Sequence, residues 1–224
     1  MSQADKDTRL HIFLLASLVG VFIWSFIDCF ELLTWVLDAL PVVIGVAVLV
    51  SVYRKFRFTS FAYILIWLYA IFLLIGAHYT YSRAPLFNWI RDTFELSRNY
   101  YDRLGHLLQG FVPAIIAREV LLRKSPLQRG GWLLTTVLCF CLAVSALYEL
   151  FEWLVVVIAQ DDSVTFLATQ GDVWDAQKDM ALCLVGAGFS LLTLAKLHDK
   201  ALKKLDSYKA TETTEKFKCQ NARN

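Results

Sequence analysis

Charged residues are scarce in this chain. Lys, Arg, Asp and Glu make up 19% of its 224 residues, whereas 57% are hydrophobic. An ordinary soluble domain carries about 25% charged residues, so the composition excludes that class. The net charge of +2 is small, and no basic module bearing aromatic residues is present. We therefore expect no nucleic-acid partner.

The chain also lacks the sequence patterns of common metal, redox and hydrolase sites. Its five cysteines form no CxxC pair and show no zinc-ligand spacing, and we infer no disulfides. The motifs GxSxG and HExxH are absent, as is a phosphatase-like set of Arg and His. There is no internal repeat. No small-residue cleavage site follows the first apolar block, which therefore predicts a retained helix and not a signal peptide.

Long apolar runs are the dominant feature that is present. A helix needs roughly 20 apolar residues to cross a bilayer, and in lipid it satisfies its own backbone polar groups. Six runs qualify: 10–27, 32–53, 61–78, 104–122, 132–158 and 180–197. We predict an all-α polytopic membrane protein, a bundle of about six transmembrane helices forming one membrane domain over residues 1–205. The polar residues 206–224 predict a disordered cytoplasmic tail.

Basic residues predict the orientation of this bundle. Thirteen lie in one set of connections: Lys6, Arg9, Arg54, Lys55, Arg57, Arg118, Arg123, Lys124, Arg129, Lys196, Lys200, Lys203 and Lys204. The other set has five: Arg83, Arg91, Arg98, Arg103 and Lys178. By the positive-inside rule, both termini are cytoplasmic. The long outward connection Tyr79–Tyr101 is amphipathic, and it either lies in the outer interface or packs as a loop on the helix ends.

Two carboxylates lie inside a very apolar run. Glu149 and Glu152 are the only charges between Trp132 and Ala159 and share one helix face. They lie roughly 9–14 Å below the outer end of the helix. Ionisable groups at such depth are costly and usually pair or face a cavity. The two would share a cation or a proton, or would pair with an outward arginine, Arg98 or Arg103.

Neighbouring helices carry further ligand-type residues at the same depth. Asp102 and His106 are four residues apart and share a face. A carboxylate beside a histidine fixes its tautomer for metal ligation or proton transfer; the alternative is an ordinary hydrogen-bonded histidine at a helix end. A stripe with spacing i, i+3, i+7 opens the last helix, and one of its first two members could instead cap that helix. Its members are Asp172, Asp175 and Asp179.

Together these residues predict one buried site at the outer helix ends. The predicted catalytic residues are Glu149, Glu152 and His106; the predicted ligand-binding residues are His78, Gln109 and Tyr148. The predicted metal ligands are Asp102, His106, Asp172, Asp175 and Asp179. Oxygen ligands with one or two imidazoles suit Mg, Mn, Ca or Zn. The site predicts that His106, Glu149 and Asp175 lie within about one ligand shell of each other. Asp38 is ambiguous and is left out, and His11 and His198 look incidental.

Four segments resemble the YjdF-type family of bacterial inner-membrane proteins. They are GAHYTYSRAPL from Gly76, NYYDRLGHLLQGFVPAIIARE from Asn99, SALYELFEW from Ser145 and FLATQGDVWDAQKDM from Phe166. The resemblance spans the membrane region. It implies a multi-pass protein of the bacterial inner membrane and implies no particular activity.

A looser resemblance is to VanZ-like membrane proteins. Their pattern is Asp–basic–x–x–His, then a Glu-containing helix, then D-x-x-D-x-x-x-N. The segment from Asp102 to His106 is similar to the first element, and the segment from Asp172 is similar to the third. Asp179 stands where that family has Asn, and Glu152 stands where it has Gln. The added acidity favours a more cationic ligand.

Three functions stay open from the sequence. The first is an enzyme at the outer leaflet acting on a lipid-linked or cell-envelope substrate, with Glu149 or Glu152 as general base and a divalent metal activating water. The second is ion- or proton-coupled binding or transport. The third is a structural or accessory role for the polar cluster. The expected partners are the lipid bilayer and a small-molecule or lipid-linked ligand.

Overall fold

The protein is all-helical in its computed structural model, which describes residues 3–159 and 169–221. The elements are α1 (Gln3–Phe26), α2 (Leu32–Val52), α3 (Ser60–Tyr79), η1 (Tyr81–Arg83), α4 (Pro85–Thr93), α5 (Tyr101–Lys124), α6 (Gly131–Ala159) and α7 (Asp175–Asn221). None of the described residues forms a strand. Six of the helices are long and apolar enough to cross a membrane. The predicted fold class is confirmed.

Several helices extend beyond the apolar runs that predicted them. α1 already begins at Gln3, and α7 begins at Asp175 and continues to Asn221. Hydropathy marks only the part of a helix that lies in the bilayer, whereas the helix itself continues through polar turns. Residues 206–221 contain neither proline nor glycine, the two strongest helix breakers. The structure therefore differs from the sequence prediction of a disordered tail.

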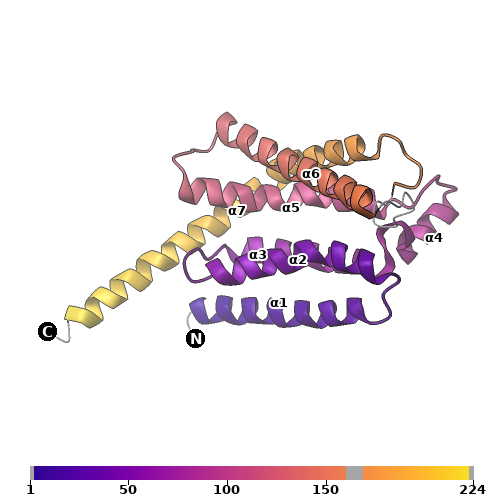
Figure 1. Cartoon of the computed structure of the whole chain (residues 1–224). Coiled ribbons are helices and arrows are strands. Elements are labelled where there is room, and N and C mark those ends of the chain that lie inside the picture. The colour runs from indigo at the N-terminus through magenta and orange to yellow at the C-terminus, as the bar shows by residue number, and fades with distance from the viewer. Residues whose placement is uncertain (1–2, 160–168, 222–224) are drawn as a thin grey trace.

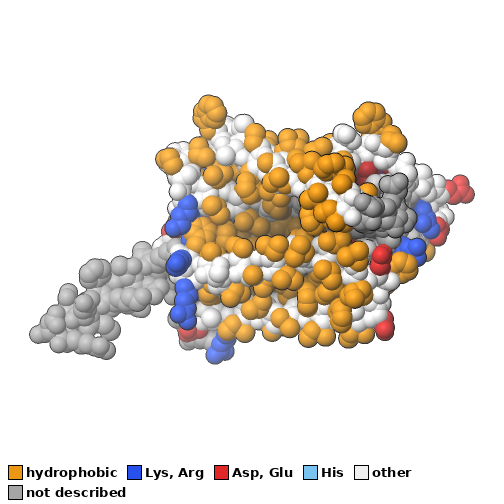
Figure 2. All heavy atoms as spheres, viewed as in Figure 1, with side chains coloured by type: hydrophobic (Ala, Val, Ile, Leu, Met, Phe, Trp, Pro, Cys, Tyr) orange, Lys and Arg blue, Asp and Glu red, His pale blue; other side chains and the backbone are white. Residues whose placement is uncertain are grey.

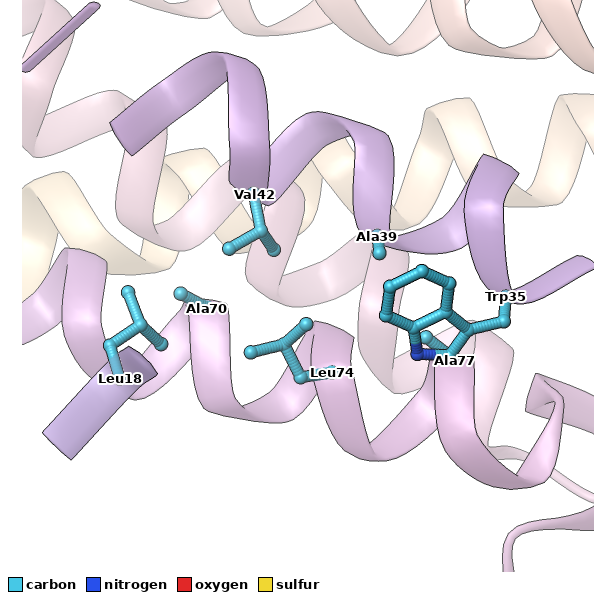
Figure 3. Packing of buried hydrophobic residues seen from close by; sticks show 7 residues of the cluster. All are labelled: Leu18, Trp35, Ala39, Val42, Ala70, Leu74 and Ala77. Atoms are coloured by element: carbon cyan, nitrogen blue, oxygen red, sulfur yellow. The ribbon is translucent and has the colours of Figure 1, made fainter. Parts of the chain in front are cut away.

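Two layers of helices make up the bundle. α1, α2 and α3 form one layer and α5, α6 and α7 form the other (Figure 1). The layers meet mainly where α3 packs against α5. A buried apolar cluster joins the first layer, with large side chains set against small ones (Figure 3). Its members are Leu18 from α1, Trp35, Ala39 and Val42 from α2, and Ala70, Leu74 and Ala77 from α3.

The most extensive helix contact is between α5 and α7. A methyl group added at Gly110 of α5 would lie 1.8 Å from the carbonyl oxygen of Cys183. One added at Gly186 of α7 would lie 1.9 Å from the carbonyl oxygen of Leu107. Glycine at both positions therefore lets the two backbones touch, as small residues commonly do between membrane helices. This contact fixes the register of the carboxylates that α5 and α7 carry.

Both termini lie at the same end of the bundle (Figure 1), and Lys and Arg side chains gather there (Figure 2). We call this the basic end. It contains a buried ion network centred on Glu119, which is fully buried. Glu119 accepts hydrogen bonds from the backbone N–H and the hydroxyl of Thr59, at 2.9 and 2.8 Å. It also accepts from Arg123 at 2.6 Å and from His198 at 3.0 Å.

His198 is thus a structural residue and not an incidental one. Arg118 donates to its Nδ1 at 2.8 Å. An arginine can only donate, so Nδ1 accepts and Nε2 carries the proton that is donated to Glu119. The sequence missed this network because Glu119 and His198 lie 79 residues apart. The basic end of the bundle therefore holds buried polar groups in addition to the expected Lys and Arg.

The connection between α3 and α5 contains η1 and α4. Leu86, Trp89 and Phe94 of this segment are each more than 60% exposed, as expected of an amphipathic helix lying in the membrane interface. Asn99 fastens the segment to the bundle, because its side-chain amide donates to the carbonyl oxygen of Ala84 at 3.1 Å.

Candidate functional site

A cavity of about 310 Å³ lies between the two layers. Figure 2 shows a hollow between α2 and the α5–α6 layer, bordered by hydrophobic side chains. Each lining helix contributes one stripe at helical spacing. The stripes are Asp38, Pro41, Val42, Gly45 and Val46 of α2; Ile66, Tyr69, Ala70 and Leu73 of α3; Asp102, Gly105, His106, Gln109, Val112, Pro113 and Ile116 of α5; and Val144, Tyr148 and Glu152 of α6. Tyr81 of η1 completes the lining.

The cavity is polar toward one end. Asp38 lies near the start of α2, Asp102 and His106 near the start of α5, and Glu152 near the end of α6. All of these helix ends point away from the basic end. The lining nearer the basic end is apolar and includes Val46, Ile66, Val112 and Ile116. A site of this volume with one polar end suits a small amphipathic molecule.

His106 is at the centre of the polar end. Its Nδ1 lies 3.1 Å from Gln109 Oε1 and 3.6 Å from Glu149 Oε1. Its Nε2 lies 3.5 Å from Asp102 Oδ1 and 3.9 Å from Asp179 Oδ2. Residues from α5, α6 and α7 thus converge on one imidazole. The α7 carboxylate that reaches it is Asp179 and not the expected Asp175, which lies one turn earlier on the same face.

Two arginines pair with the aspartates of this end. Their ion pairs are Arg98 with Asp102 (3.4 Å), Asp172 (3.7 Å) and Asp175 (2.7 Å), and Arg103 with Asp172 (2.9 Å), Asp175 (2.5 Å) and Asp179 (2.5 Å). Among the described residues, the ion pairs of both arginines are with aspartates, and none is with the two glutamates of α6, the alternative considered from the sequence. All four aspartates predicted as metal ligands are therefore engaged by arginine in this structure, Asp179 as closely as Asp175 and Asp102 less closely.

Asp172 also organises the start of α7. Its Oδ1 accepts the backbone N–H of Trp174 at 3.1 Å, which closes a turn just before Asp175, the first helical residue. A capping side chain accepts from the second or third N–H of the helix, so this bond precedes α7 and does not cap it. Lys178 lies 2.6 Å from Asp172 Oδ2. The hydrogen bond from Lys178 is the main cause that holds the pKa of Asp172 below its ordinary value. Asp172 lies before the spanning part of α7.

Three buried residues are spaced as cation ligands would be. Asp102, His106 and Asp179 each offer a ligand atom, and these atoms lie within 4.8 Å of one another. Two ligands about 2.1 Å from one ion are at most about 4.2 Å apart, so small shifts would close the group around an ion. With Gln109 Oε1 as acceptor, the His106 proton lies on Nδ1. This leaves Nε2, the nitrogen facing both aspartates, free to ligate.

The two glutamates of α6 have different surroundings. Glu149 Oε1 is buried and has no hydrogen-bond partner among the described residues, although it lies near the His106 ring. Glu152 is 8% exposed and lines the cavity. Within residues 3–159 and 169–221, no Lys or Arg forms an ion pair with either side chain.

The remaining predicted binding residues lie at different places. Gln109 and Tyr148 line the cavity, and the Tyr148 ring lies edge-on to His106 with centroids 6.2 Å apart. His78 does not line it. Its Nδ1 lies 3.2 Å from the carbonyl oxygen of Ser25 and its ring packs on Trp24, so it joins α3 to α1.

Asp38 is the site residue that sequence analysis missed. It is 2% exposed, lines the cavity, and its Oδ2 has no hydrogen-bond partner in the described part of the chain. The only signal in the sequence was the position of Asp38 near the start of α2. The sequence alone could not show that this face of α2 points toward the other helices.

Tyr81 reaches the cavity through a slot made by two glycines. A methyl group at Gly76 would lie 2.7 Å from the Tyr81 ring, and one at Gly105 would lie 3.3 Å from it. Burial raises the pKa of Tyr81 well above its ordinary value, and the nearby charge of Asp38 adds to the rise. The tyrosine and the aspartate therefore belong to the same polar end of the cavity.

Comparison with known proteins identifies the family. Residues 10–200 match the family described as "Predicted membrane protein (DUF2238)". The chain belongs to this family. It is 39% identical over 188 residues to "Inner membrane protein YjdF" of Escherichia coli (strain K12), with 84% of this chain and 90% of that protein covered. No solved structure matches it. The chain is a multi-pass protein of the bacterial inner membrane.

Proposed function

We propose that the cavity binds an amphipathic molecule of the cell envelope, such as a lipid-linked substrate, and that a divalent cation beside its polar end supports chemistry on it. One observation carries the proposal: a cavity that is polar at one end, apolar along the rest and open on the side of the bundle. Because the flanks of the helices face lipid, a molecule in the bilayer can enter sideways with its polar group toward His106.

The proposed orientation follows from charge. The basic end lies in the cytoplasm by the positive-inside rule, with both termini there. The polar end of the cavity then lies in the outer half of the membrane. Substrate reaches it from the outer leaflet or from the periplasm, and α4 lies beside the same end of the bundle (Figure 1).

Asp102, His106 and Asp179 would hold the cation, and the chemistry we propose is metal-assisted hydrolysis or transfer. A bound divalent cation lowers the pKa of a water ligand and polarises an ester or phosphoryl oxygen. Glu152 lines the cavity, and in this proposal it would accept the proton of the attacking water and pass it to the leaving group. Gln109, which accepts from Nδ1, would orient the His106 ring, and Glu149 lies 3.6 Å from the same nitrogen.

The two other functions have less support. A transport path needs polar groups through the bundle, but residues 110–117 of α5, between Gln109 and Arg118, read GFVPAIIA. That stretch is about 12 Å long and has no polar side chain. A purely structural cluster would pair its members, as the arginines do, whereas Asp38, Glu149 and Glu152 have no Lys or Arg partner among the described residues.

Metal analysis tests the cation. Protein purified in nonionic detergent without chelator would be analysed for bound metal and then titrated with Mn²⁺ and Zn²⁺. We expect about one equivalent in wild type, and at least tenfold weaker binding in His106→Ala and Asp179→Asn, since each removes a ligand. Asp199→Asn is the matched control, because Asp199 lies on the same helix and pairs with Arg118 at the basic end. Folded wild type that binds no metal would reject this part of the proposal.

A substitution that fills the cavity tests whether an amphipathic ligand binds there. Gly45 lines the apolar part and has open space around its Cβ position, with nothing from the described residues within 4 Å. Gly45→Leu is expected to fold and to lose lipid that co-purifies with wild type, as measured by native mass spectrometry. Gly20→Leu, at an equally open position on α1, is the control. Equal lipid retention in both variants would argue against a ligand in this cavity.

A further inference from the structure

The cavity has two walls, and the proposed cation ligands account for only one. α2, α3 and η1 form the wall opposite His106, where Asp38, Tyr69 and Tyr81 face the space. Tyr148 of α6 lies at the same polar end. This wall therefore combines a carboxylate with tyrosine rings and needs an explanation of its own.

Asp38 is the acid of this wall that lacks a compensating partner. Its side chain is almost fully buried and its Oδ2 lacks a hydrogen-bond partner among the described residues. The aspartates of α5 and α7 differ, because each lies within 3.7 Å of an arginine nitrogen. A buried carboxylate without a partner is costly, so its presence in a membrane helix marks a place where a ligand supplies the partner.

The described residues around the cavity offer no Lys or Arg as that partner. Among its described lining residues there is no Lys or Arg, whereas Asp38, Asp102 and Glu152 are all acidic. An anionic group would be repelled from the Asp38 wall, and a cationic group would be attracted to it. A cationic ligand would supply the positive charge that no Lys or Arg of the lining provides.

The tyrosine rings favour an organic ammonium group over a metal ion as the ligand's cation. The face of an aromatic ring attracts an ammonium group, and clusters of such rings beside a carboxylate are the usual binding sites of quaternary ammonium ligands. Tyr81 is placed for this by the slot at Gly76 and Gly105, which brings its ring between α3 and α5. Oxygen ligands for a metal are few on this wall, because Asp38 is its only carboxylate among the lining residues described.

We propose that Asp38, with the rings of Tyr69, Tyr81 and Tyr148, binds the ammonium group of the amphipathic ligand. The apolar stripe from Val42 to Val46 then contacts its hydrocarbon part. The ligand is thus an ammonium-bearing amphiphile, either an aminolipid of the bilayer or a free lipophilic amine. This inference rests on the proposed function for the ligand-binding cavity but does not require the cation at His106.

The test compares two probes of equal shape. Octyltrimethylammonium and its uncharged isostere, in which carbon replaces the nitrogen, would be titrated by calorimetry into the full-length protein in nonionic detergent. We expect wild type to bind the ammonium at least about tenfold more tightly, from the carboxylate and ring contacts together. Equal affinity for the two probes would overturn the ammonium subsite while leaving the cavity as a ligand site. Binding of neither probe would instead overturn the cavity proposal itself.

Two variants locate the effect. Asp38→Asn keeps the shape of the side chain and removes its charge, so it should lose the ammonium preference and keep the affinity for the uncharged probe. Binding of that probe also reports that the variant is folded. Tyr69→Leu should reduce the preference partly, by removing one ring. Asp199→Asn, the same change at the basic end, should leave it intact. An undiminished preference in Asp38→Asn would overturn the assignment.

A third arm distinguishes the two sources of the amine. Protein released from nanodiscs with equal parts of phosphatidylethanolamine, phosphatidylcholine and phosphatidylglycerol would be examined by native mass spectrometry. Retention of the two ammonium-headed lipids in wild type and its loss in Asp38→Asn would identify a bilayer aminolipid. Tight binding of octyltrimethylammonium without lipid retention would identify a free amine. Selective retention of the anionic lipid would contradict the proposal.

Discussion

Replacing Gly186 by alanine should separate α5 from α7 and loosen the candidate site. The added methyl group would lie 1.9 Å from the carbonyl oxygen of Leu107, where ordinary contact begins at 3.4 Å. The two backbones would have to move apart by roughly 1.5 Å at this point, since backbone atoms cannot rotate away as a side chain can. The same helices carry His106 and Asp179, so the displacement reaches their relative placement.

The expected loss of stability in Gly186→Ala can be estimated from the cost of overpacking. Overpacking a well-packed contact costs about 1–3 kcal/mol, and a clash with backbone belongs at the upper end. Gly188 is the matched control, two residues away on the same helix and with nothing among the described residues within 4 Å of its Cβ position. Gly188→Ala should be neutral or stabilising by up to about 1 kcal/mol, because alanine favours the helix. The two variants should therefore differ by about 3 kcal/mol.

The assay is unfolding of the purified protein in detergent, by heat or by titration with sodium dodecyl sulfate, followed by tryptophan fluorescence. Gly186→Ala should unfold earlier than wild type, and its affinity for Mn²⁺ should fall more than that of Gly188→Ala. Equal stability of the two variants would refute the argument that glycine permits this helix contact. Lower stability with unchanged Mn²⁺ affinity would refute the link between the contact and the site.

Two further predictions concern the first layer and the start of α7. Leu74→Ala should lower the free energy of unfolding by about 2–4 kcal/mol, because Leu74 is fully buried between α1, α2 and α3 and its truncation leaves a cavity. Leu68→Ala, at a 52% exposed position of the same helix, should lower it much less. Equal losses of stability in the two variants would contradict this packing. The pKa of Asp172 is lower in the folded protein than in the unfolded chain. Its ion pairs therefore stabilise the protein above about pH 4, and this stabilisation is lost as the pH falls through the pKa that Asp172 has in the folded protein. The melting temperatures of wild type and Asp172→Asn should therefore differ at pH 7 and converge toward pH 3, and a difference that does not change with pH would contradict the ion-pair role.

Much of the candidate site could be predicted from helical spacing. Asp102 and His106, or Glu149 and Glu152, share a face because residues three or four apart always do on a helix. The sequence therefore found the α5, α6 and α7 contributions and their common depth. It could not choose between Asp175 and Asp179, since both lie on one stripe and only the register of α7 against α5 selects the one that reaches His106.

Other parts depended on contacts between helices distant in sequence. Asp38 and Glu119 each lie on a helix face whose direction the sequence leaves undefined. Helix packing orients the Asp38 side chain toward the cavity and the Glu119 side chain toward His198. The partners of the arginines could not be predicted from the sequence either. Arg98 and Arg103 pair with aspartates because the start of α7 lies beside α5, which is a contact between distant segments.

The sequence by itself determined that this is a six-span membrane protein, since apolar runs of bilayer length have no other stable placement. It also determined the depth of the acidic and histidine residues, because depth is position along a helix. Only the tertiary structure decided which of those residues meet, which are neutralised by arginine, and where a cavity remains. Those outcomes depend on helix rotation and close approach, which Gly110 and Gly186 set through backbone contact that hydropathy and spacing do not encode.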